Sequence, residues 1–191
     1  MNTGNGEISL QDIPDLSGIE DTSQRMEWSD GWYKGTILEQ HAFTDKNGND
    51  RVFESTDQPS QAGDSRNIKL QIAVKRTSDG RMLNVSNLIN YRPEDLTQET
   101  VQAVAAQKEK VDAGEEWGPM FRSFITLTRL AKLQKLAGVR QFQRNGNGGL
   151  DLHSLYGKEG YFRLGPDERS GGKYKEVKDM RVDRPTKATV L

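Results

Sequence analysis

The segment 160–182 holds the residues whose types and spacing suggest chemistry most clearly. Two short extended runs flank a turn rich in Gly and Pro, and basic and aromatic side chains are interleaved on both runs. A hairpin of this composition can neutralise phosphates with its cations while its rings stack on bases. Its candidate contact residues are Tyr161, Arg163, Arg169, Lys173, Tyr174, Lys175 and Arg181.

Alternation along the second run predicts Lys173, Lys175 and Arg181 on one side and Tyr174 on the other. Tyr174 can therefore either stack on bases or pack in a core, and the pattern favours neither role.

Charge is distributed unevenly along the chain. Residues 1–30 hold seven acids and one base, residues 31–119 hold 14 acids and 11 bases, and residues 120–191 hold seven acids and 15 bases. The net charge of -1 therefore hides an acidic N-terminal part and a basic C-terminal part. Such asymmetry is typical of a basic binding region beside an acidic tail. Ordinary variation of surface charge is the alternative.

The composition predicts one domain with a modest core. Of 191 residues, 33% are hydrophobic, and the mean hydropathy is -0.82. The absence of Cys excludes disulfides and thiolate chemistry. The sequence opens without a basic and apolar leader, and no apolar run approaches the roughly 18 residues that span a bilayer. We therefore expect a cytoplasmic protein that does not contact a membrane.

We expect three parts along the chain, namely a flexible acidic arm at 1–28, one domain at 29–185 and a short tail at 186–191. Pro93 and the acids after it favour the start of a helical segment, and Gly138 favours its end. Hydrophobic alternation predicts strands in the domain at about 28–43, 67–76, 81–89, 160–164 and 173–182.

Five strands with helices between the third and the fourth form the order of the OB-fold, a five-stranded barrel that binds oligonucleotides. We therefore predict a mainly β, five-stranded OB-fold barrel with a helical insert at about 93–137. In that fold, ligands contact strands two and three and the loops joining strands one–two and four–five. Those loops would lie here at about 44–66 and 165–172.

The candidate contact residues on the first three strands and the first of these loops are Trp32, Lys34, Arg51, Phe53, Arg66, Lys69, Lys75, Arg76 and Arg81. Trp32, Phe53, Tyr161 and Tyr174 are the candidate stacking platforms beside these cations. Core packing is the alternative role for each ring, and a solvated sheet face is the alternative for the lysines.

Three segments resemble a known family. They are Gly31-Trp-Tyr-Lys-Gly-Thr-Ile-Leu-Glu, Asn67-Ile-Lys-Leu-Gln-Ile-Ala-Val and Gly172-Lys-Tyr-Lys-Glu-Val-Lys-Asp-Met-Arg, the last followed by Pro185. These segments are similar to strands of the phage-encoded OB-fold single-stranded-DNA-binding proteins of replication and recombination modules, over most of residues 30–185. The resemblance implies single-stranded DNA as ligand, phage replication or recombination proteins as partners, and the cytoplasm of an infected bacterium. Many such proteins recruit partners through an acidic C-terminal tail, whereas the acidic arm here is N-terminal.

The sequence offers little for catalysis or cofactors. With only two His, His41 and His153, and no Cys, a zinc site is not expected. The turn that begins at Asp45 lacks the Gly and Glu spacing of a calcium loop, and Asn145-Gly-Asn-Gly-Gly lacks the Lys-Ser/Thr of a P-loop. The acids show no paired spacing typical of a two-metal nuclease. We therefore expect a non-enzymatic protein with no metal and no cofactor.

A protein-interaction role is the alternative function. The helical insert is long for an OB-fold connection, so it could serve as a dimerisation or docking surface of a structural or host-directed phage accessory protein. The acidic arm could also mimic nucleic acid in a basic groove. An enzyme is the weakest hypothesis, because a metal-dependent nuclease would need clustered acids.

Overall fold

Strand β5 (Arg66–Lys75) is the centre of the fold, and its residues alternate between aliphatic and polar. Four aliphatic side chains are 0% exposed, namely Ile68, Leu70, Ile72 and Val74. Lys69 on the opposite side is half-buried and Lys75 is exposed. On the core side the predicted alternation is confirmed. On the opposite side Gln71 and Ala73 are also buried, at 2% and 8% exposed.

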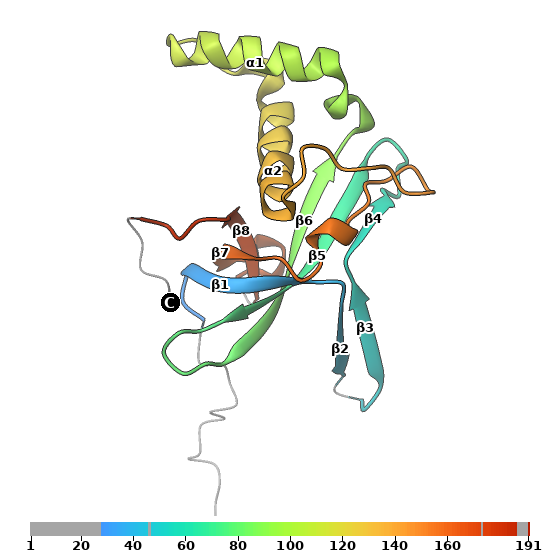
Figure 1. The fold of residues 1–191 in the computed structure, drawn as a ribbon, viewed down its shortest axis with the longest axis vertical. Coiled ribbons are helices and arrows are strands. Elements are labelled where there is room, and N and C mark those ends of the chain that lie inside the picture. The colour runs from blue at the N-terminus through green and yellow to red at the C-terminus, as the bar shows by residue number, and fades with distance from the viewer. Residues whose placement is uncertain (1–27, 46, 173, 187–190) are drawn as a thin grey trace, which may run out of the picture.

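The structure is a computed structural model that describes residues 28–45, 47–172, 174–186 and 191 (Figure 1). The expected arm at 1–28 lies outside the described residues except for Trp28. Lys173 and most of the expected tail at 186–191 also lie outside them.

Six strands form one mainly antiparallel sheet around β5. Strands β1 (Gly31–Leu38) and β4 (Thr56–Pro59) pair with β5 along one edge, and β6 (Met82–Tyr91) pairs along the other. On its far side β1 pairs with β7 (Glu159–Pro166), which in turn pairs with β8 (Lys175–Arg181). The described strands thus form an open sheet with β6 and β8 at its two ends.

The first expected strand is in fact two strands. Strand β1 ends at Leu38, and β2 (Gln40–Thr44) pairs with β3 (Asp50–Glu54) in a separate hairpin that projects from the main sheet (Figure 1). The loop expected at 44–66 was therefore wrong, because it contains β3 and β4. Asp45 closes the hairpin, since its Oδ1 accepts hydrogen bonds from the backbone N–H groups of Asn47 and Asn49 at 2.9 and 3.0 Å.

The helical insert predicted at 93–137 is confirmed. It contains α1 (Gln98–Asp112) and α2 (Phe121–Ala137), and α2 ends at Gly138 with φ 73°. None of the helices in the described parts of the chain is long and apolar enough to cross a membrane.

Asp95 fastens the start of the insert to α2. Its carboxylate accepts hydrogen bonds from the Arg92 backbone N–H at 2.9 Å and from the Ser123 hydroxyl at 2.8 Å. Burial alone would raise the pKa of Asp95, but these hydrogen bonds and the Arg92 guanidinium outweigh it and lower the pKa. A charged Asp95 therefore holds the two elements together.

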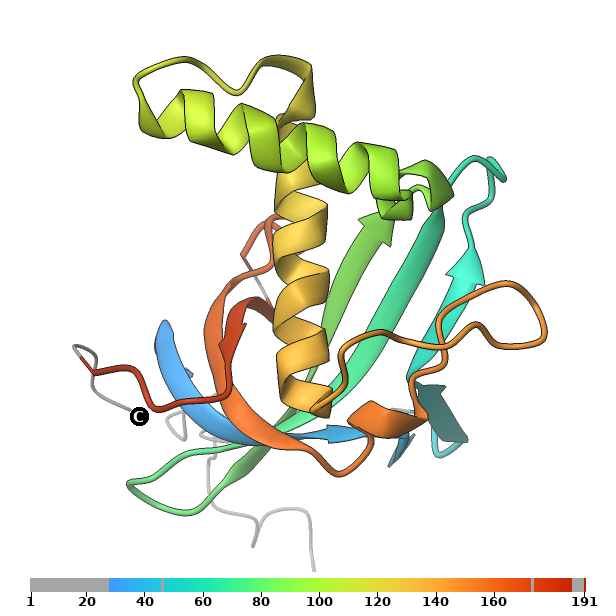
Figure 2. The ribbon, with the colours of Figure 1, turned by 45° about the horizontal axis from the view of Figure 1, so that its top comes forward.

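Helix α2 packs between the two ends of the open sheet. It contacts both β6 and β8, and Figure 2 shows it standing between them. Its buried face carries Leu130, Leu133 and Leu136. Gly160 permits the close approach of Leu136, because a Cβ there would lie 2.6 Å from the Leu136 Cδ2 atom. The helix thereby covers aliphatic side chains that an open sheet would otherwise expose to water.

Candidate functional site

The outer face of the sheet is the side of β1, β5 and β7 opposite the buried aliphatic residues. It carries two cations that lie opposite each other on neighbouring strands. Lys34 of β1 lies directly opposite Lys75 of β5, and both are exposed. Lys34 forms an ion pair with Glu159 at 2.8 Å, and this contact raises the pKa of Lys34. Like charges directly opposite each other on a sheet are destabilising. Glu159 offsets part of this repulsion, and an anion placed over the two lysines would relieve the rest.

The β2–β3 hairpin carries a row of stacked rings beside this face. The His41 and Phe43 ring centroids are 6.0 Å apart, and those of Phe43 and Phe53 are 5.0 Å apart, with interplanar angles of 16° and 23°. Lys69 Nζ lies 4.7 Å from the centroid of the Phe53 ring. Because Lys69 projects from the outer face of β5, the row of rings borders that face.

The row of rings is accessible. Phe53 is 43% exposed, and His41 and Phe43 are half-buried. Arg51 lies opposite Phe43 in the hairpin and is exposed, although its Nε contacts Asp45 Oδ2 at 3.2 Å. The hairpin thus presents aromatic surface and positive charge together, which is the combination that single-stranded nucleic acids require.

A second aromatic and basic cluster lies on the outer face of β1, β7 and β8. Tyr161 is partly exposed and lies opposite Lys34 on one side and Arg181 on the other. The Arg181 guanidinium lies 5.1 Å from the centroid of the Trp32 ring, which is only 8% exposed. Trp32 is therefore covered rather than open to a base, unlike the expected stacking platform. Arg163 is exposed, opposite Asp179.

Tyr174, in the connection between β7 and β8, is 58% exposed and does not pack in the core. Arg169 in the same connection is exposed and contacts Asp167 at 3.3 Å and Glu176 at 3.4 Å. Tyr174 and Arg169 therefore remain candidate contact residues.

The expected alternation along β8 is wrong. The pairing of β7 with β8 shifts register after Arg163, so Val177 and Met180, three residues apart, are both buried. Lys175 therefore does not share a side with Arg181, as strict alternation would require. Its amine forms an ion pair with Asp30 at 2.7 Å.

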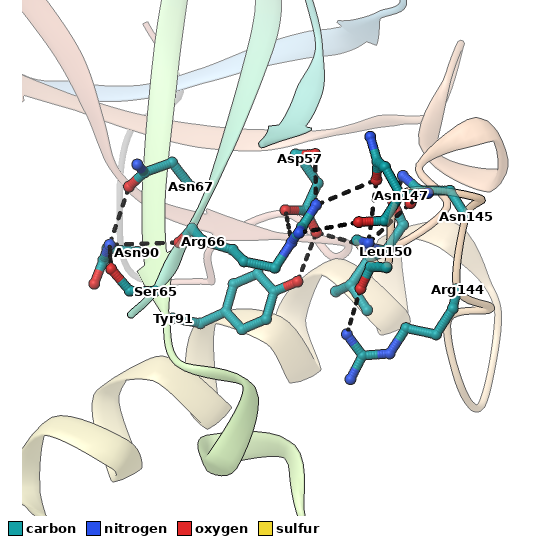
Figure 3. A network of polar contacts seen from close by, with 12 residues as sticks. Asp57, Ser65, Arg66, Asn67, Asn90, Tyr91, Arg144, Asn145, Asn147 and Leu150 are labelled. Carbon is teal, nitrogen blue, oxygen red and sulfur yellow. Dashed lines mark hydrogen bonds and ion pairs between the residues drawn. The ribbon is translucent and has the colours of Figure 1, made fainter. Parts of the chain in front are cut away.

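Arg66 belongs to the interior and not to the binding surface. Its Nε donates to Asp57 Oδ1 at 2.9 Å, and the side chains of Arg66 and Asp57 are 10% and 0% exposed (Figure 3). Asp57 Oδ2 also accepts from the Tyr91 hydroxyl at 2.7 Å and from the Leu150 N–H at 2.6 Å. Burial and the hydrogen bond to Asp57 raise the pKa of Tyr91.

The same network anchors a distant loop. The Arg66 guanidinium donates to the backbone and side-chain oxygens of Asn147, both at 3.3 Å (Figure 3). Arg66 therefore joins β5, β4 and the turn at 145–149, and its charge is neutralised by Asp57. We accordingly remove it from the candidate contact residues.

Arg76 is also largely engaged within the protein. It donates to both oxygens of Asp79, at 2.9 and 2.6 Å, and its guanidinium lies 5.0 Å from the centroid of the Trp28 ring. Arg81 is exposed and lies 3.5 Å from the same carboxylate. Of these two cations, Arg81 is the one whose charge reaches the surface.

The side chains that could support other chemistry are dispersed. In the described residues, no three His, Asp or Glu side chains come together to hold a metal ion. His153 pairs with Asp151 at 2.6 Å, and this hydrogen bond raises the pKa of His153. The pair lies on a pocket of about 180 Å³ that also includes Asp57 and Tyr156. Its carboxylates make this pocket a poor site for a phosphate.

His41 and Phe43 are not among the contact residues predicted from the sequence. His41 and Phe43 lie two residues apart in β2, and Arg51 and Phe53 lie two residues apart in β3. The turn that begins at Asp45 separates the two pairs. That symmetry is the signal for a hairpin with cross-strand ring pairs.

The outer face and the hairpin together place exposed ring surface beside Lys34, Lys69 and Lys75. No protein-family profile matches the chain, and no curated protein sequence matches it at a significant level.

The contrast between Arg66 and Arg51 gives a stability test. We expect Arg66→Ala to lower the free energy of unfolding by about 3–5 kcal/mol, because it leaves Asp57 buried without its cation. Arg51→Ala removes an exposed Arg–Asp pair and should cost about 0–1 kcal/mol. Urea denaturation of both variants measures the difference. Equal losses would contradict the buried role of Arg66.

Proposed function

We propose that this protein binds single-stranded DNA on the outer face of the sheet, beside the β2–β3 hairpin. The observation that carries the proposal is the ring row of His41, Phe43 and Phe53, with Lys69 held over Phe53. The exposed ring surface is in contact with water, and bases stacked on it would remove that surface from water.

The arrangement favours a single strand over a duplex. Stacking on a side-chain ring needs a base that is not already stacked between its neighbours in a duplex. The lysine pair of Lys34 and Lys75 lies on the same face and suits the phosphates between such bases. Tyr161, Arg163 and Arg181 extend the basic and aromatic surface across β7 and β8.

The strand order supports an OB-fold barrel as the finer description of the fold. The order β6-β5-β1-β7-β8, with helices between β6 and β7, is the order of a five-stranded OB barrel. The Asn87 Nδ2 atom of β6 donates to the Val177 carbonyl of β8 at 2.9 Å. This side-chain contact joins the two ends of the open sheet. On this proposal the β2–β3 hairpin occupies the position of the ligand-binding loop between OB strands one and two.

The biological setting rests on the sequence resemblance alone. We propose phage DNA replication or recombination as the process, proteins of those modules as partners, and the host cytoplasm as the location.

The ring row gives the sharpest test of binding. We expect Phe53→Ala to weaken binding of a labelled oligothymidine by about 1–3 kcal/mol, because it removes a stacking platform. Fluorescence anisotropy at low salt measures the dissociation constant, and urea denaturation measures stability.

Val52→Ala is the matched control, since Val52 is exposed on the opposite side of the same strand. It should leave affinity unchanged. Equal loss in both variants, or no binding by the unaltered protein at low salt, would overturn the proposal.

The poor packing of α1 favours protein interaction as a second candidate function. Of its 15 residues only Val104 is buried, and isolated helices of this length are marginal in water. Val101 on α1 and Phe121 at the start of α2 are exposed apolar side chains. The insert also carries charges of both signs, Glu115, Glu116 and Arg122, so a second copy of the chain would offer opposite charges.

If the protein dimerises through the insert, Val101→Glu should make it monomeric, because the substitution places a charge in the apolar contact between the two copies. Light scattering after size-exclusion chromatography over a range of concentrations measures the mass. A monomeric mass for the unaltered protein at every concentration would exclude this second candidate.

A further inference from the structure

A basic pocket lies where the end of α2 meets the chain that follows β8. Its volume is about 360 Å³, and its lining includes Lys132 and Lys135 of α2, Arg181 at the end of β8, and Asp183 and Arg184 of the segment after β8. The pocket lies apart from the β2–β3 hairpin, and of its lining residues the binding function proposed above uses Arg181 alone.

The pocket has an excess of positive charge after its ion pairs are counted. Lys132 pairs with Asp179, and Lys135 lies 3.3 Å from Asp183 in a largely exposed contact. Exposed pairs of this kind contribute little. Arg184 has no ion pair within the described residues, and Arg181 approaches Asp179 only at 4.0 Å. Four cations therefore share two carboxylates.

Local structure explains only part of this charge. A lysine in the last turn of a helix is favoured by the negative end of the helix dipole, which accounts for Lys135 but not for Lys132, one turn earlier. Arg184 comes from a different part of the chain and adds like charge to the same space, while Arg181 lines the pocket with its guanidinium held over the Trp32 ring. Guanidinium groups present planar, paired donors that match the oxygens of a phosphate. Lysine and arginine from two elements around one pocket thus suit a phosphate group.

Arg181 connects the pocket to the outer face. Its guanidinium lies over the Trp32 ring, opposite Tyr161, while the same residue lines the pocket. Arg181 therefore lies at the border between the outer face and the pocket.

We propose that this pocket binds a phosphate group, which in the function proposed above is a backbone phosphate of the DNA strand as it leaves the outer face. The identification of the phosphate with DNA rests on that proposed function, whereas the phosphate site itself does not. The pocket lengthens the path of the bound strand from the hairpin to the end of α2.

The test uses Lys135→Ala with Arg184→Ala in one protein, measured against two oligothymidines. The affinity of the double variant for the longer oligothymidine should fall by roughly tenfold. The slope of log affinity against log salt concentration should fall by about 0.7 per lost phosphate contact. A short oligonucleotide that spans only the hairpin and the adjoining sheet should bind unchanged. The control variant, Lys108→Ala with Lys110→Ala, removes two exposed charges from α1. It should leave the affinities for both oligonucleotides unchanged. Equal loss for both lengths, or no loss, would overturn a strand path through the pocket.

Titration with pyrophosphate tests the phosphate site independently of DNA binding. Isothermal titration should show pyrophosphate binding by the unaltered protein and its loss in the double variant, whether or not DNA binds. Binding of pyrophosphate without binding of DNA would assign the pocket to a free phosphate-bearing ligand and reject its place in a DNA path. No pyrophosphate binding would overturn the phosphate site.

Discussion

Strand β5 is hydrogen-bonded on both edges along nearly its whole length, and the rest of the sheet depends on this constraint. With β6 on one edge and β1 and β4 sharing the other, β5 cannot shift register without turning its aliphatic side chains to solvent. The orientation of β5 therefore determines that Lys69 and Lys75 face outward. Through its pairing with β1 it also places Lys34 beside Lys75.

The cations of this protein fall into two groups according to what neutralises them. Arg66 is buried against Asp57 and holds β5, β4 and a distant turn together, so its charge is not available to a ligand. Arg76 is held by both oxygens of Asp79. The carboxylate that Lys34 contacts on the outer face, Glu159, is itself exposed, and Lys75 is exposed as well, so these charges stay at the surface. Desolvation makes this division necessary, because a buried cation needs a carboxylate and an exposed one does not.

Short-range patterns predicted much of the fold. The alternation of β5, the helical insert with its end at Gly138, and the exposed lysines all follow from neighbours in sequence. Arg66 could not be placed this way, since its partners lie nine and 81 residues away. The covering of Trp32 by Arg181 and the register shift in β8 likewise depend on strands that are far apart in the chain. The hairpin was missed because one residue, Glu39, separates two strands that look continuous in sequence.

The ring row beside the outer face is the central part of the proposed binding site, and crosslinking would test its contact with DNA directly. An oligonucleotide that carries iodouracil reacts under light with aromatic side chains stacked on it, and mass spectrometry locates the modified residue. Stacking of bases on the ring row should give crosslinks at Phe53 and Phe43, at the hairpin that borders Lys69. Crosslinks confined to the helical insert, with none in the hairpin, would contradict it.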